Sequence, residues 1–251
     1  MSNIIGLPEV RHLFGELSDE QISIAAKNLG PLKKYLDKLI AQDVSRYFQW
    51  LSDAEAIELM VKHKLRSQEE AEKHVANCRE AAKSIGYNGK IFVLVKAGFT
   101  LKSHAPKFEL CYKNWEYLQD WTLENDKKTV HSLVFFVPRW VPDSSRKDVD
   151  AQITLLSKFR ETHKLSKHYL INYGDASLLA GLILSHCKRT GERIPLNCNW
   201  VRTDTVRTDG LRLLLGLFGG YGLGCSFWHD GDGPRRGYVG CFALGVEVLG
   251  N

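Results

Sequence analysis

The sequence lacks any closely spaced pair of cysteines. Its 251 residues include six Cys, and the nearest two along the chain, Cys187 and Cys198, lie far outside the C-x-x-C spacing of zinc ribbons and thioredoxin-type dithiols. Most of the six stand in apolar runs. We therefore expect reduced, mostly buried thiols, and neither a structural zinc site nor a disulfide framework.

Short motifs with a known chemistry are also missing. The chain contains no HExxH, no GxSxG and no closely spaced pair of metal ligands. The glycine-rich stretch 216–226 does not match a GxGxxG loop that opens a helix, so it does not indicate a dinucleotide site. We expect no cofactor and no bound metal, and the sequence does not specify a reaction.

One uncharged run, residues 213–228, is apolar enough that a membrane-spanning helix has to be considered. As a helix it would measure roughly 24 Å, short of the ~30 Å hydrocarbon core, and five of its residues are glycine. Two buried strands joined by a glycine turn fit better. The N-terminus has no basic region followed by an apolar stretch, so it does not resemble a signal peptide. We expect a cytoplasmic protein without membrane contact.

Helix start signals dominate residues 1–88. Ser18, Ser52 and Ser67 are each followed three residues later by Gln or Glu, which is the capping-box pattern. This portion carries twelve Lys and Arg against thirteen Asp and Glu, a net charge of −1, so the basic excess of the chain lies in residues 89–251. A helical DNA-binding module would carry positive charge itself, so we expect no nucleic-acid partner.

The pattern changes in residues 89–251. Apolar, β-branched runs predict strands at 90–98 and 131–137, and residues 167–174 form a further strand candidate. Helices are predicted at 149–163 and 176–188, and the last sixty residues show only strand and turn signals. We predict an α+β fold: a helical N-terminal portion, then a mixed β-sheet with flanking helices and an antiparallel C-terminal part. The boundary near residue 88 is soft, so both portions can belong to one compact domain.

The loop from Pro138 to Asp148 is the first candidate ligand site. It joins a predicted buried strand to a predicted helix, and the free N–H groups of a helix start favour anions. Ser144 and Ser145 can donate to an anionic ligand, and Arg139 or Arg146 can bind it with two N–H groups. The alternative is structural, because Ser145 and Asp148 also fit a capping arrangement.

The repeat "VRTDTVRTDG", residues 201–210, is the second candidate. A strand alternates faces with a period of two, so Arg202 and Arg207 cannot be equivalent sites on one strand. A two-residue hairpin loop would place Arg202 and Asp204 on the leucine face of the next strand. A three-residue loop, residues 208–210 with Gly210 left-handed, instead pairs them on the other face. We favour the second hairpin, with Arg202 and Asp204 as an ion pair that faces either a cleft or solvent.

Two functions follow as hypotheses. The first is binding of a small anionic ligand or a protein partner. Its residues would be Arg139, Ser144, Ser145, Arg146, Arg202 and Asp204. The alternative is a metal-assisted hydrolase that uses a carboxylate–histidine cluster, which would require convergence of Asp204, Asp209, His229 and Asp230.

Overall fold

Local start signals place the helices. The computed structural model describes residues 44–107, 121–124, 127–195, 199–219, 222–228 and 238–250. Within them, Ser52 and Ser67 both form complete capping boxes, at the starts of α4 and α5. The predicted capping box at Ser18 lies outside the described residues.

The described part of the chain contains both helices and strands, without a regular alternation of strand and helix. The helices are η1 (Val44–Arg46), α4 (Asp53–Lys62), α5 (Gln68–Ser84), η2 (Ala105–Lys107), α6 (Val149–Thr162) and α7 (Ala176–Thr190). The strands are β1 (Phe48–Leu51), β2 (Phe92–Val95), β3 (Leu123–Glu124), β4 (Ser132–Trp140), β5 (Trp200–Arg207), β6 (Arg212–Gly219), β7 (Gly222–Trp228), β8 (Val239–Gly240) and β9 (Phe242–Val248). The predicted α+β class is confirmed.

The strands divide between two sheets. The first has the order β1-β2-β4-β9 and is antiparallel throughout. The second has the order β3-β5-β6-β7, also antiparallel, with the short β8 parallel to β5. The uncharged run 213–228 therefore forms most of β6 and β7, as its glycines predict. Within the described residues, no helix is long and apolar enough to cross a membrane.

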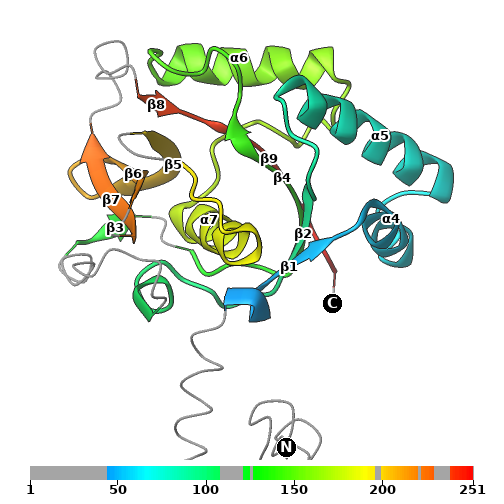
Figure 1. Ribbon diagram of the computed structural model, residues 1–251, viewed down its shortest axis with the longest axis horizontal. Coiled ribbons are helices and arrows are strands. Elements are labelled where there is room, and N and C mark those ends of the chain that lie inside the picture. The colour runs from blue at the N-terminus through cyan, green and yellow to red at the C-terminus, as the bar shows by residue number, and fades with distance from the viewer. Residues whose placement is uncertain are drawn as a thin grey trace, which may run out of the picture. The chain divides into compact units, whose positions relative to one another are not determined.

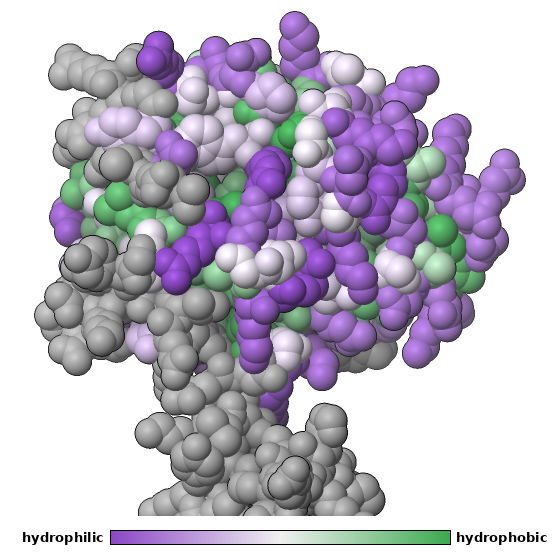
Figure 2. Space-filling view, viewed as in Figure 1, coloured by the Kyte–Doolittle hydropathy of each residue, from purple (hydrophilic) through white to green (hydrophobic). Residues whose placement is uncertain are grey.

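Helix α7 lies between the two sheets (Figure 1). Every residue from 176 to 187 is buried, so the helix is covered all round. Its side chains form one hydrophobic core with β2, β4 and β9 of the first sheet and with β5, β6 and β7 of the second. A second core lies on the opposite face of the first sheet, under α4, α5 and α6. Hydrophilic residues predominate on the outer surface over α5 and α6 (Figure 2).

Residues 167–174 do not form the predicted strand. A single bridge joins Tyr169 to Gly245 of β9, and the Leu170 N–H donates to the Leu244 carbonyl at 2.8 Å. Leu170 has a positive φ of 53°, which turns the chain away after this contact. The segment is a loop that covers part of the β9 edge. The division of the chain at residue 88 stays a prediction.

The hairpin between β5 and β6 has the predicted three-residue loop. Val206 pairs with Arg212, and the Arg207 N–H donates to the Leu211 carbonyl, which leaves residues 208–210 as the loop. Gly210 adopts φ +82°. Apart from its two chain neighbours, no atom of the described residues lies within 4 Å of the position where a Cβ would stand, so the need for glycine at this position comes from backbone conformation.

We predict that Gly210→Ala lowers the free energy of unfolding by about 1 kcal/mol, because alanine is strained at this φ. Gly210→Asn is the matched control, since asparagine tolerates the left-handed region, and it should cost less. Urea unfolding of both variants measures the difference. Equal costs for Ala and Asn would show that the turn does not select for the left-handed conformation.

Candidate functional site

Arg139 forms an ion pair with a residue outside the predicted anion loop. Its guanidinium contacts the Glu192 carboxylate at 2.5 Å and lies 5.9 Å from the centre of the Tyr87 ring. Glu192 also contacts His186 at 3.1 Å. This ion pair links Arg139 of β4 to the segment after α7.

Asp148, not Ser145, caps α6. Its carboxylate accepts the Ala151 N–H at 2.8 Å. Ser144 is buried and its hydroxyl accepts the Cys241 N–H at 3.3 Å. Ser145 is half-buried, and Arg146 is exposed with φ 59°. Anion binding at this loop stays a prediction, and an anion there would meet the negative charge of Asp148.

Arg202 and Asp204 do not form the predicted ion pair. Arg202 is 3% exposed and donates to the Lys147 carbonyl at 2.9 Å, which ties β5 to the loop before α6. The Asp204 carboxylate instead accepts the N–H groups of Tyr173 at 3.2 Å and Gly174 at 2.7 Å. The register of β5 against β6 shifts between Arg202 and Val206, so simple alternation, on which the prediction relied, fails across this bulge.

Asp204 lines a cleft of about 680 Å³ beside the edge of β9. Asp175 lines it too, and its carboxylate caps α7 by accepting the Leu178 N–H at 2.9 Å. Burial raises the pKa of Asp204, while the hydrogen bonds from Tyr173 and Gly174 act in the opposite direction. Of the two predicted candidates on β5, Asp204 faces the cleft and Arg202 lies buried beneath a loop.

Basic and apolar side chains complete the lining of this cleft. Lys127 and Lys128 are exposed, as are Val130 at 49% and Ile171 at 52%. The full lining is Lys127, Lys128, Thr129, Val130, Ser132, His168, Ile171, Asn172, Gly174, Asp175, Leu178, Asp204, Leu244, Gly245 and Val246. Both signs of charge therefore meet in one hollow.

The residues of the hydrolase hypothesis are only partly described. Asp209 is exposed on the β5–β6 turn and forms two hydrogen bonds with Arg207, which lower its pKa to about 2. His229 and Asp230 lie outside the described residues. Across the described ranges, no group of three His, Cys, Asp or Glu side chains is arranged to hold a metal ion. The hydrolase reading stays a hypothesis that no contact in the described residues supports.

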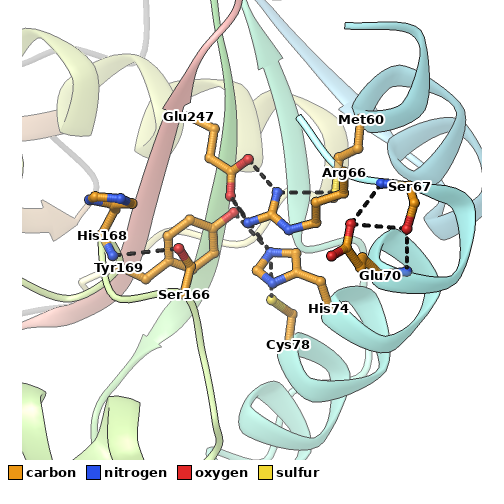
Figure 3. Close-up of polar contacts among 10 residues, drawn as sticks. All are labelled: Met60, Arg66, Ser67, Glu70, His74, Cys78, Ser166, His168, Tyr169 and Glu247. Carbon is orange, nitrogen blue, oxygen red and sulfur yellow. Dashed lines mark hydrogen bonds and ion pairs between the residues drawn. The ribbon is translucent and has the colours of Figure 1, made fainter. Parts of the chain in front are cut away.

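A polar cluster that the sequence did not predict lies at the end of β9 (Figure 3). Glu247 of β9 forms two hydrogen bonds of 2.5 Å with Arg66, which precedes α5. His74 and Cys78 of α5 point toward them, with His74 Nε2 3.1 Å from the Tyr169 hydroxyl and 3.6 Å from the Cys78 sulfur. Helix α5, the loop at Tyr169 and the last strand are thereby joined.

The electrostatics of this cluster favour a structural role. Burial raises the pKa of both Cys78 and Tyr169 well above their ordinary values, so neither is ionised at neutral pH. Burial, reinforced by the charge of Arg66, lowers the pKa of His74 to about 4. Burial alone would raise the pKa of Glu247, but hydrogen bonds and charge from Arg66 lower it below its ordinary value. The cluster holds one ion pair and no activated nucleophile.

A second hollow of about 350 Å³ adjoins this cluster. Arg66 and Glu247 line it, together with Leu65, Ser166, His168, Val246 and Val248. His168 and Val246 line both this hollow and the larger cleft. The two depressions therefore meet at the edge of β9.

Sequence reasoning had no signal for this cluster. Spacing places His74 and Cys78 one turn apart on a helix, but Arg66 and Glu247 are 181 residues apart. The pairing of β9 with β4 brings Glu247 beside the first half of α5.

Comparisons of the chain with protein-family models, with curated proteins and with solved structures find no match.

We predict that His74 makes folding stability fall as the pH is lowered from about 6.5 to about 4. In this window the unfolded chain protonates the imidazole and the folded chain does not, so His74 contributes a slope of up to about 1.4 kcal/mol per pH unit. Burial lowers the pKa of His163 and His186 in the same direction, so they add to the slope of the wild type.

His74→Gln should therefore reduce this slope without abolishing it. Urea unfolding at several pH values between 4 and 7 measures the effect, with His63→Gln as a control histidine outside the cluster. An unchanged slope in His74→Gln would contradict the burial of a neutral imidazole at this position.

Proposed function

We propose that the chain binds a small charged ligand in the 680 Å³ cleft beside β9. The observation that carries the proposal is the lining of this cleft, in which Asp175 and Asp204 share one hollow with Lys127 and Lys128. The volume falls within the range of about 300–1,000 Å³ typical of small-molecule sites. Converging polar groups in such a hollow are the usual mark of ligand recognition.

Both carboxylates are held in place before any ligand arrives. Asp204 accepts two backbone N–H groups, and Asp175 accepts the Leu178 N–H that it caps. A carboxylate such as that of Asp204 can accept more hydrogen bonds than these two, so it can also accept one from a ligand. Because burial raises the pKa of Asp204, a donor group placed beside it would offset part of that penalty. The ligand therefore carries an N–H or O–H donor that is directed at these two carboxylates.

The two lysines indicate that the ligand also carries an acidic group. Their ammonium groups are exposed and attract a carboxylate or phosphate. A ligand with both features is an amino acid, a hydroxy acid or a sugar phosphate. The proposed ligand is still anionic, as the sequence suggests, but we propose that it binds near Asp204 and not at the loop before α6.

We predict that the double variant Lys127→Ala/Lys128→Ala weakens binding about tenfold, equivalent to about 1.4 kcal/mol. Thermal shifts against amino acids, hydroxy acids and sugar phosphates identify the best binder, and calorimetry then measures its Kd. Lys62→Ala/Lys73→Ala, two exposed lysines on α4 and α5, is the control with the same change of charge and should change Kd less than about twofold.

Asp204→Asn tests the donor half of the ligand and should also weaken binding. Asp150→Asn, an exposed residue in the first turn of α6, is its control. The proposal is wrong if no member of the panel binds at millimolar concentration, or if both lysine variants bind equally well.

A further inference from the structure

Among the described residues, no strand pairs with the outer edge of β9 over its last residues. Of the strands that the structure describes, only β4 pairs with β9, so β9 lies at an edge of the first sheet. On the other side, the loop at 169–170 makes one bridge to Gly245 and one hydrogen bond to Leu244. Beyond that bridge Val248 is 62% exposed. An open strand edge is a template for pairing with another extended chain.

Backbone alternation shows which groups face the open side. The Leu244 carbonyl points away from β4, because it accepts the Leu170 N–H. The pairing of β9 with β4 is regular from Ala243 to Val248, so the N–H and C=O of Val248 also point away from β4. One residue later, the Leu249 N–H points the other way and donates to the His131 carbonyl on the β4 side, as backbone alternation requires.

The two hollows share His168 and Val246 at this edge, and from there the larger extends along the α7 face of the sheet and the smaller toward the α5 face. Leu244 and Val246, which line the larger cleft, belong to the core that packs on α7. Glu247, which lines the smaller hollow, contacts Arg66 on the α5 face. A strand added beside β9 would direct successive side chains to opposite faces. One side chain would then enter the cleft and its neighbour the smaller hollow.

We infer that an extended segment of a partner protein pairs with the end of β9 as a fifth strand of the first sheet. The side chain that enters the cleft is basic, since Asp175 and Asp204 lie there, and an acidic residue beside it meets Lys127 and Lys128. The inference rests on the proposed function, because this basic side chain would supply the donor group of the ligand.

A second copy of this chain fits the edge less well. The β9 sequence is "FALGVEV", which has no basic residue to reach the two carboxylates. Its one charged side chain, Glu247, is already paired with Arg66. Charge complementarity therefore favours a different protein as the occupant.

Random peptides displayed on phage, selected against the full chain, supply the probe. The best enriched peptide is synthesised with a fluorescent label and its Kd is measured by anisotropy. Val248→Pro removes the outward N–H and should weaken binding roughly fivefold or more, the effect of losing one hydrogen bond. Val248→Ala keeps the N–H and should change Kd less than about twofold.

N-methylation of the peptide gives a test that does not depend on the folding of a variant. Strand pairing uses the N–H groups of alternate residues, so N-methyl groups at one parity should abolish binding, and those at the other parity should leave it nearly unchanged. Equal loss at both parities, or no enriched peptide with a submillimolar Kd, would overturn the inference. A concentration-dependent dimer that Val248→Pro abolishes would also overturn it, by showing that a second copy occupies the edge.

The two proposals fail separately. A small molecule whose binding depends on Asp204 but not on Val248, with no peptide enriched, leaves the proposed function standing and overturns strand addition. Peptide binding that depends on Val248 and is unchanged in Asp204→Asn supports strand addition and overturns the role given to the cleft.

Discussion

The burial of α7 is the constraint on which the remaining structure depends. A helix with twelve consecutive buried residues has no face for solvent, so both sheets must pack against it. The first turn of α7 thereby comes to the place where the edge of one sheet meets β5 of the other. Gly174, with φ +84°, makes the turn that lets Asp175 cap the helix and offers its N–H to Asp204. The cleft therefore forms at the N-terminal end of α7, where Gly174 and Asp175 line it.

Contacts on the α5 face of the first sheet hold β9 and the 169–170 loop, which border the cleft, in position. The Arg66–Glu247 pair, with His74 and Tyr169, joins α5 to the last strand and to the loop that bridges Gly245 (Figure 3). Burying an ion pair adds little net stability, but removing one partner leaves an uncompensated charge. The role of this cluster is therefore positional: it sets where β9 and the 169–170 loop lie, and both of these border the two hollows.

Sequence reasoning succeeded where the determining interactions are local. The capping boxes at Ser52 and Ser67 and the three-residue turn ending at Gly210 depend on neighbours a few residues away, and all three are confirmed. It failed at Arg202 and Asp204, because a bulge in β5 breaks the alternation that the prediction assumed. The cluster around Glu247 was missed because partners 181 residues apart leave no spacing to recognise. Asp204 was selected as a site residue from its pattern, but the reason it lines a cleft is the tertiary position of α7.

The pairing of β4 with β9 also affects how the chain reaches its fold. Ser132 pairs with Val248, so the first sheet is completed only after more than a hundred intervening residues have been placed. Helix α7 lies within that interval and remains without its full cover until β5 to β7 and β9 arrive. Closing so long a loop before its contacts form slows folding and leaves apolar surface transiently exposed. Although α7 is fully enclosed in the folded protein, its apolar surface is exposed during folding until β9 pairs with β4. The slower this last pairing, the longer the unfinished chain is open to aggregation.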